Sequence, residues 1–285
     1  MRYYILHKTT YKYDRPVVLT PHAIRLRSRC DGSQKLLSFS LQIDPQPIGI
    51  SDIIDLDGNS LIQTWFQEPT DYLKIEVSSE VETYRNNPFD YLLEPSAVTL
   101  PIDYPTSLLS QLQPYLQPHQ SGFIDPVAVQ LAQEICQEVN NQTNSFLFRL
   151  NQRIYENCQH IIREDGDPFP PGITWNQKAG SCRDVTVLFM EVCRAVGLAA
   201  RFVSGYQEGD PDSKERDLHA WVEVYLPGAG WRGYDPIQGL AVADGNIALV
   251  ASAIPKYTAP ISGSFCAPGK QLEMIVDLSI KHLSS

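Results

Sequence analysis

The stretch AGSCRDVTVLFMEVCRAVG, from Ala179 to Gly197, is the part of this sequence around which the rest of the fold is organised. Ser181 followed three residues later by Asp184 is typical of a capping box, which satisfies free amides at the start of a helix. Apolar side chains then recur at steps of three and four residues: Val185, Leu188, Phe189, Val192 and Val196. Because Gly197 is typical of the residue beyond a helix end, the stretch predicts one helix with a buried apolar face.

Cys182 lies in the first turn of this predicted helix. Free amides and the positive end of the helix dipole favour an anion at that position. They therefore favour the thiolate, which is the nucleophilic form of cysteine. The alternative is a small buried cysteine that only packs, so a catalytic role requires partner residues elsewhere in the chain.

Two candidate partners follow downstream. The run LHAWVEVYL alternates as a half-buried strand does, and four residues share one face: His219, Trp221, Glu223 and Tyr225. A turn at PGAG then leads into WRGYDP, which carries Asp235. A thiol, an imidazole and a carboxylate are the three parts of an activated-thiol site, with the roles of nucleophile, base and orienting acid.

The length of the turn at PGAG decides whether Asp235 can reach His219. A four-residue loop would pair Asp235 with Val222 and place it on the face opposite His219. A three-residue loop would pair Leu226 with Gly230, which places Asp235 diagonally from His219 on the same face. A slip of one residue turns every side chain over, and the sequence allows both registers.

Three ordered motifs resemble the core of the bacterial transglutaminase-like superfamily, which is related to papain-type cysteine proteases: GSCRDVTVLFMEVCRAVGLAARFVSGY, LHAWVEVYLPGAGW and YDPIQG. The resemblance covers residues 146–239. It implies that Cys182 is the nucleophile, His219 the base and Asp235 the orienting acid. Two positions differ from the usual pattern of this subfamily. Arg183 stands where glutamine is common, and AIPKY at 253–257 replaces a glycine-arginine-aspartate-tyrosine segment, both at the expected substrate cleft.

The first hundred residues are predicted to be rich in strands. Residues 3–13 alternate with an aromatic face, and further strand candidates are separated by turn clusters: 23–27, 37–43, 61–66 and 73–81. This region also resembles the N-terminal region that often precedes bacterial transglutaminase-like cores. We therefore expect an α+β protein with a β-sandwich-like N-terminal domain (residues 1–105). A papain-like core of helices against an antiparallel sheet should follow it (residues 106–285).

Within the predicted core, apolar periodicity indicates helices at 126–139 and 145–164, a buried strand at 198–206 and a final strand at 271–280. An acyl-transfer site also needs hydrogen-bond donors for the developing oxyanion. The backbone amide of Cys182 is one candidate, because amides at a helix start lack internal partners. The second donor should come from the preceding loop, with Gln177 or Trp175 as candidates, although a polar turn residue and a packing aromatic explain them equally well.

The overall composition favours an ordinary globular protein of two domains, with 285 residues, 43% of them hydrophobic and 20% charged. The formal net charge of −10 argues against nucleic-acid and anionic-membrane partners and is compatible with cationic substrates. The six cysteines form no C-x-x-C pair, and no secretory signal or membrane-spanning stretch is evident. We therefore expect a cytoplasmic protein that requires no metal or other cofactor.

Taken together, the motifs predict thiol-dependent acyl transfer at the amide carbonyl of a peptide or protein. Hydrolysis by a cysteine peptidase or amidase is favoured, because nothing in the sequence defines a site that would hold an amine and exclude water. Protein crosslinking by a transglutaminase is the alternative among enzymes. A non-catalytic peptide-binding module is the alternative outside them.

Overall fold

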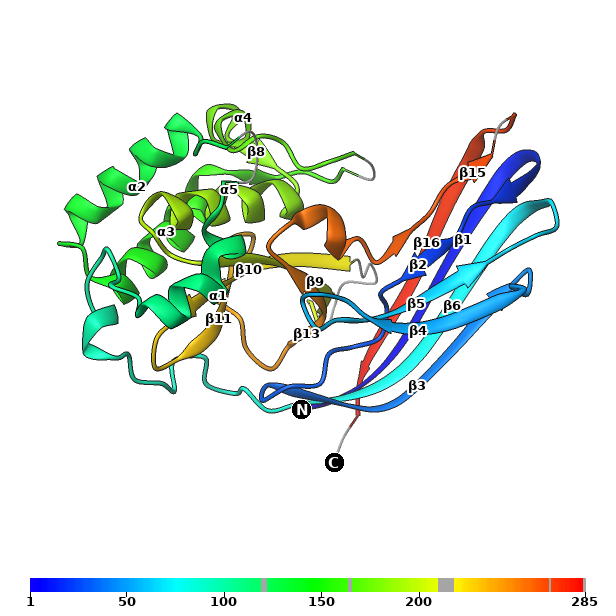
Figure 1. Ribbon diagram of the computed structural model, residues 1–285, viewed down its shortest axis with the longest axis horizontal. Helices are drawn as coiled ribbons and strands as arrows, with labels where there is room; N and C mark the ends of the chain where they lie inside the picture. The colour runs from blue at the N-terminus through cyan, green and yellow to red at the C-terminus, as the bar shows by residue number, and fades with distance from the viewer. Residues whose placement is uncertain (119–121, 164–165, 210–217, 267, 284–285) are drawn as a thin grey trace.

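The computed structural model describes residues 1–118, 122–163, 166–209, 218–266 and 268–283. It has two regions that lie side by side: a region of long curved strands and a helical region built around a shorter sheet (Figure 1). This is the α+β architecture predicted from the sequence. Among the described residues, no helix is both long and apolar enough to cross a lipid bilayer.

The N-terminal region consists of two antiparallel sheets. Its strands are β1 (Arg2–Leu19), β2 (His22–Ile24), β3 (Gln34–Asp44), β4 (Gly49–Ile54), β5 (Ser60–Trp65) and β6 (Thr70–Thr83). One sheet has the order β15-β1-β6-β3, with β16 also paired to β1, and the other has the order β14-β2-β5-β4. Alternate residues of β1 are buried, as predicted, with Tyr3, Ile5 and His7 on the inner face.

The C-terminal tail returns to these N-terminal sheets as β14 (Ile261–Ser262), β15 (Phe265–Cys266) and β16 (Gln271–His282). β16 pairs antiparallel with β1, from Tyr3 opposite His282 to Tyr13 opposite Gln271. Strand pairing thus joins these last strands to the N-terminal sheets, and the division into domains 1–105 and 106–285 stays a prediction. The edge of β1 that β6 leaves unpaired offers backbone hydrogen-bond groups to another strand. The alternation of residues 271–280 predicts a strand but does not specify which sheet edge that strand joins.

The helical region surrounds a five-stranded antiparallel sheet with the order β12-β11-β10-β9-β13. Its strands are β9 (Ala200–Gln207), β10 (Leu218–Leu226), β11 (Gly230–Asp235), β12 (Leu240–Ala241) and β13 (Asn246–Ser252). The helices are α1 (Thr106–Leu116), α2 (Pro126–Glu138), α3 (Thr143–Asn157), α4 (Pro171–Gln177) and α5 (Cys182–Ala195). Short 3₁₀ helices are η1 (Pro95–Ala97) and η2 (Pro255–Thr258).

Helix α3 ends earlier than the predicted limit at residue 164. Cys158 is already extended, and β7 (Gln159–His160) pairs in parallel with β8 (Ala179–Gly180). The apolar periodicity continues past the true helix end, so it overestimated the length. The pairing has a consequence for the site, because β8 immediately precedes Ser181 and α5.

The core of the helical region is built on α5, which packs against α2, α3, α4, β9 and β10. Its predicted apolar face is buried, with Val185, Leu188 and Phe189 at most 1% exposed. Burying a side chain of this size stabilises the fold by about 1.5–3 kcal/mol. Phe189 also stacks on Tyr234 of β11, with the ring centroids 5.7 Å apart. This packing fixes the position of α5 and therefore of Cys182, its first residue.

The two regions share an interface on which β9 and β13 meet the N-terminal sheets. Tyr206 and Ile247 belong to the same apolar cluster as Tyr3 and Ile5. Polar contacts add to this packing, since Tyr3 donates to Glu208 at 2.9 Å. The end of β9 is consequently fixed by residues from both regions.

Candidate active site

The start of α5 is capped as the sequence predicted. The backbone N–H and the hydroxyl of Ser181 both donate to Asp184 Oδ2, at 2.7 Å and 2.8 Å. Cys182 is the first residue of the helix and is half-buried against the core. Its sulfur is thus attached to the end of the helix where the dipole favours an anion.

Asp184 also holds the preceding loop, a role that the capping pattern did not indicate. Its Oδ1 accepts hydrogen bonds from Arg163 Nη1 at 2.6 Å and from the Phe169 N–H at 2.7 Å. Burial would raise the pKa of this carboxyl, but donation by the Phe169 amide, Arg163 and Ser181 holds the pKa below its usual value. The Arg163 guanidinium lies 3.7 Å from the centre of the Phe169 ring. Asp184 therefore ties the loop to the helix that carries Cys182.

Arg183, the departure from the expected motif, binds the same loop. Its Nη2 donates to the backbone carbonyl of Arg163 at 2.7 Å. Arg183 and Asp184 thus hold Arg163 through its main chain and its side chain respectively. The residue next to Cys182 therefore contributes to the position of the loop.

The β10–β11 hairpin adopts the register that the proposed triad requires. Leu226 pairs with Gly230 and Val222 with Tyr234, so the turn contains three residues. Gly228 has a φ of +86°, and a Cβ there would lie 2.5 Å from the Leu92 carbonyl oxygen. Position 228 therefore requires glycine for two reasons: its positive φ and the close approach of the Leu92 backbone.

This register brings His219 and Asp235 together. His219 Nε2 lies 2.6 Å from Asp235 Oδ2, and both side chains are largely buried. Asp235 Oδ1 accepts the backbone amides of Ile237 at 3.0 Å and Gln238 at 3.3 Å. The carboxylate is therefore held in place by its own chain while its second oxygen faces the imidazole.

Cys182 is near enough to His219 to affect the protonation of the imidazole. Burial disfavours the imidazolium, but the charge and hydrogen bond of Asp235, followed by those of Cys182, raise the pKa of His219 above its usual value. Because Nε2 is bound to Asp235, Nδ1 is the nitrogen that remains for the thiol proton. This arrangement can supply an activated thiol and a general acid.

The two side-chain candidates for the oxyanion site lie on α4. Gln177 is exposed at the end of the helix, and Trp175 is half-buried against the core. Lys178 Nζ lies 3.2 Å from the centre of the Trp175 ring. The roles of Gln177, Trp175 and the Cys182 amide in binding an oxyanion stay predictions.

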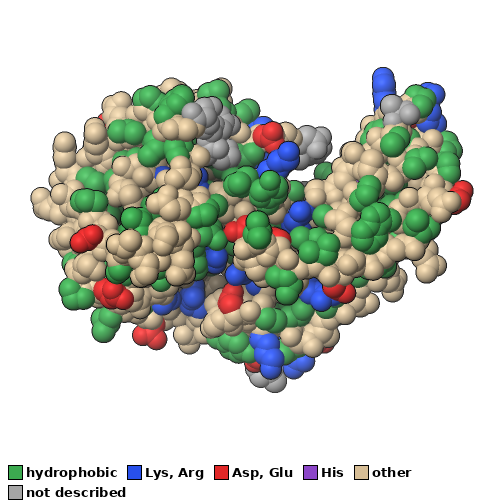
Figure 2. Space-filling view, viewed as in Figure 1, with side chains coloured by type: hydrophobic (Ala, Val, Ile, Leu, Met, Phe, Trp, Pro, Cys, Tyr) green, Lys and Arg blue, Asp and Glu red, His purple; other side chains and the backbone are tan. Residues whose placement is uncertain are grey.

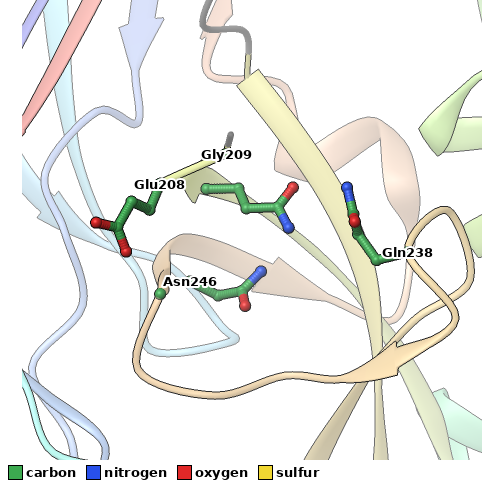
Figure 3. Close-up of a pocket in the computed structure, with 6 residues that line it drawn as sticks. Glu208, Gly209, Gln238 and Asn246 are labelled. Carbon is green, nitrogen blue, oxygen red and sulfur yellow. The ribbon is translucent and has the colours of Figure 1, made fainter. Parts of the chain in front are cut away.

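A cavity of about 420 Å³ lies at the end of β9 and was not predicted from the sequence (Figure 3). It is lined by Gln207, Glu208, Gly209, Gln238, Gly245 and Asn246. These residues come from the end of β9, from the segment after β11 and from the start of β13. Gln238 belongs to the YDPIQG motif that carries Asp235, whereas the other five lie outside the three motifs.

Two family profiles match the chain. The bacterial transglutaminase-like N-terminal region matches residues 3–82, and the transglutaminase-like superfamily matches residues 129–236, which include Cys182, His219 and Asp235. This chain belongs to the transglutaminase-like superfamily. As a transglutaminase-like protein it also carries the N-terminal region that its opening strands resembled.

Curated relatives and a solved structure resemble this transglutaminase-like protein to different extents. An uncharacterised protein of Mycobacterium tuberculosis is 29% identical over 253 residues, covering 82% of this chain and 78% of that protein. A protein-glutamine gamma-glutamyltransferase of Pseudomonas aeruginosa is 34% identical over 74 residues, covering 24% of this chain and 11% of that protein.

The solved structure is a candidate cysteine protease from Cytophaga hutchinsonii. It has a TM-score of 0.74 and 20% identity, covering 100% of this chain and 92% of that one. At this level of identity the likeness establishes the fold, in which an N-terminal β-rich region precedes helices packed against an antiparallel sheet.

Proposed function

We propose that this transglutaminase-like protein is a cysteine hydrolase that cleaves an amide bond of a peptide or protein. The observation that supports it most directly is the 2.6 Å hydrogen bond between His219 and Asp235, with Cys182 near the same imidazole. A merely structural cysteine at a helix start has no need of a buried imidazole–carboxylate pair. The proposed roles are nucleophile for Cys182, general acid and base for His219, and orienting acid for Asp235.

The proposed reaction has two halves. The Cys182 sulfur attacks the carbonyl carbon, the thiol proton passes to His219, and an oxyanion forms beside the amides at the start of α5. Collapse of this intermediate breaks the C–N bond, and His219 protonates the departing amine. Water, deprotonated by His219, then attacks the thioester carbonyl, which releases a carboxylic acid and restores the thiol.

Protein crosslinking differs only in the second half, where an amine replaces water as the attacking group. The similarity of 74 residues to a glutamyltransferase favours this second candidate. We favour hydrolysis because neither the sequence nor the described residues define a site that would hold an amine and exclude water.

Capture of the acyl-enzyme tests the proposal. The wild-type protein is incubated with a peptide library, and intact mass spectrometry should find an acyl adduct that peptide mapping assigns to Cys182. The Cys182→Ala variant should form no adduct and release no product. Adding a primary alkylamine distinguishes the two enzymes: a free acid product supports hydrolysis and an alkylamide product supports crosslinking. Peptide binding without an adduct or product would instead indicate a binding module.

A further inference from the structure

We propose that the N-terminal region sets the position of His219, and that Gln34 at the start of β3 is the positioning residue. Gln34 acts through the strands that lie between it and the imidazole rather than on the reacting atoms. The inference rests on the proposed function, since that function gives His219 its role as general acid and base. It assigns the N-terminal region a part in the reaction.

The backbone at His219 depends on a single neighbouring strand. β10 pairs with β11 only from Val222 onward. Among the described residues, positions 218–221 therefore pair with β9 alone, and His219 lies opposite Gly205 there. β9 in turn pairs with β13, on which Ala248 lies opposite Gly205. His219, Gly205 and Ala248 thus form one row across the sheet, which spans two strand spacings or roughly 10 Å.

Gln34 holds the outer end of this row. β13 is the last strand in the order of its sheet, and the register of its pairing with β9 shifts just after Ala248. The Gln34 side chain supplies the hydrogen bonds that a further strand would make there. Its Nε2 donates to the Ala248 carbonyl at 2.8 Å, and its Oε1 accepts the Ala248 N–H at 2.8 Å. Buried backbone groups require such partners, so Gln34 fixes the position of Ala248.

Further hydrogen bonds fix the carboxamide of Gln34 itself. Gln34 is 2% exposed, and its Nε2 also donates to the Arg29 carbonyl at 2.9 Å. The Arg29 N–H donates to the Ala248 carbonyl at 3.0 Å. An amide nitrogen has two N–H donors, and both are used here, so one orientation of the side chain satisfies all its partners. These contacts belong to a broad junction between the two regions, which adjoin below a notch in Figure 2.

The row has little space in which to absorb a displacement. A Cβ on Gly205 would lie 2.5 Å from Trp221 Cη2 and closer still to a backbone carbonyl oxygen of β13. The Trp221 ring is buried, and its centre lies 6.3 Å from that of the His219 ring. Gln34, Ala248 and Trp221 also border one cavity of about 20 Å³, which has room for about one water molecule. A shift of Ala248 would therefore be passed to Gly205 and then to His219.

The position of the imidazole matters because two groups must meet it in the proposed reaction. His219 takes the proton of the Cys182 thiol while it remains bound to Asp235, whose carboxylate lies 2.6 Å away. Misplacing a catalytic group by about 1 Å can lower a rate about 100-fold, even when the substitution lies far from the chemistry. Loss of the Gln34 hydrogen bonds should therefore slow the chemical step more than it weakens substrate binding.

Kinetics and NMR of the Gln34→Met variant provide the test, with circular dichroism as the check on folding. Methionine keeps the length of the side chain but makes neither hydrogen bond to Ala248. For a substrate found by acyl capture, kcat should fall at least about tenfold while KM stays within about threefold. The NMR signal of the proton between His219 and Asp235, identified by its loss in His219→Ala, should shift or broaden. Gln42→Met is the matched control, since Gln42 is exposed on the same strand, and it should leave both measurements unchanged.

A second variant, Gln34→Glu, decides the matter if Gln34→Met does not fold. A protonated carboxyl can donate to one carbonyl and accept one N–H, as the carboxamide does. The ionised carboxylate only accepts, and it would face the carbonyl oxygens of Ala248 and Arg29. The ratio of its kcat to that of the wild type should therefore rise at least about tenfold from about pH 9 to pH 5, and its NMR signal should return towards that of the wild type. A constant ratio and signal would contradict the proposal.

The outcomes separate this inference from the proposed function. An unchanged signal or a kcat within about twofold of the wild type in Gln34→Met would overturn the positioning role, and turnover by the wild type would leave the hydrolase intact. A displaced signal in Gln34→Met, without turnover of any peptide by the wild type, would support the positioning role and reject the hydrolase.

Discussion

At the scale of single residues, the candidate site depends on how firmly each side chain is held. Asp235 is 2% exposed and receives two backbone amides, so its orientation is independent of the substrate. His219 depends on Asp235, since its Nε2 is bound to that carboxylate. Substitution of Asp235 should therefore act on the imidazole rather than on the fold.

Asp235→Asn should leave the protein folded and lower kcat/KM by orders of magnitude. Loss of the equivalent carboxylate in serine-protease triads costs about 10⁴-fold, because the amide favours the wrong imidazole tautomer. Steady-state kinetics on a substrate found by acyl capture would measure the effect, with circular dichroism as the check on folding. A decrease of less than about tenfold would mean that Asp235 does not orient His219.

The six cysteines should differ in their reaction with iodoacetamide at about pH 6. Burial raises the pKa of Cys136, raises that of Cys158 to about 11 and raises that of Cys193 well above its usual value, so all three should react slowly. Cys30 and Cys266 are exposed, but an ordinary thiol is almost wholly protonated at this pH. Because the pKa of His219 is raised, its imidazolium persists at pH 6 and beyond. A neighbouring cation makes a cysteine more reactive, and Cys182 is the cysteine near this imidazolium.

Peptide mapping after brief labelling should therefore find Cys182 modified first, and His219→Ala should slow its reaction. Equal labelling of Cys30 or Cys266, or an unchanged rate in the His219→Ala variant, would contradict the thiolate–imidazolium pair.

At the scale of secondary-structure elements, a buried carboxylate joins the start of α5 to Arg163 and Phe169. Asp184 has a fully buried side chain and accepts hydrogen bonds from Ser181, Arg163 and Phe169. Removing a buried partner leaves the remaining groups unpaired, which costs more than the net value of the bonds themselves.

Asp184→Ala should consequently lower the free energy of unfolding by about 3–5 kcal/mol, because it leaves the Arg163 charge without its partner. Urea unfolding would measure this loss. Asp167→Ala is the matched control: its side chain is exposed, only its backbone carbonyl accepts Arg163, and the expected change is within about 0.5 kcal/mol. A loss below about 1 kcal/mol in Asp184→Ala would show that this carboxylate contributes little to stability.

At the scale of the whole molecule, the interface between the two regions contains a buried histidine. His7 of β1 has no exposed surface, and its ring nitrogens lie 2.8 Å from the Tyr206 hydroxyl and 3.0 Å from Thr9 Oγ1. Burial lowers the pKa of His7 to about 4 from an ordinary value of 6.5. The folded protein therefore favours the neutral form of the His7 imidazole.

This shift makes the stability of the fold dependent on pH. Between pH 6.5 and 4 the unfolded chain binds a proton at His7 that the folded chain does not, so the free energy of unfolding falls as the pH falls. The shift from 6.5 to about 4 corresponds to about 3 kcal/mol.

Urea unfolding of wild type and His7→Gln at pH 7 and pH 4 would isolate the contribution of His7 from that of the carboxylates. The wild type should lose about 3 kcal/mol more than His7→Gln over this interval. Parallel pH profiles for the two proteins would contradict the assignment.

Short-range patterns in the sequence determined the local features of this protein. Helix α5, its capping box and the position of Cys182 followed from side chains within four residues of one another. The alternation in β1 and β10 followed in the same way, because a strand places successive side chains on opposite faces. The motifs around Cys182, His219 and Asp235 were sufficient to place the chain in its superfamily.

Only the tertiary structure decided the features that depend on pairing between distant segments. The three-residue turn between β10 and β11 selected the register that brings Asp235 to His219, where the sequence allowed either face. The pairing of β16 with β1, and the cavity between the ends of β9 and β13, also depend on distant contacts. Local periodicity states which side of an element is apolar, but backbone hydrogen bonds are alike at every strand edge, so packing of the whole chain selects the partner.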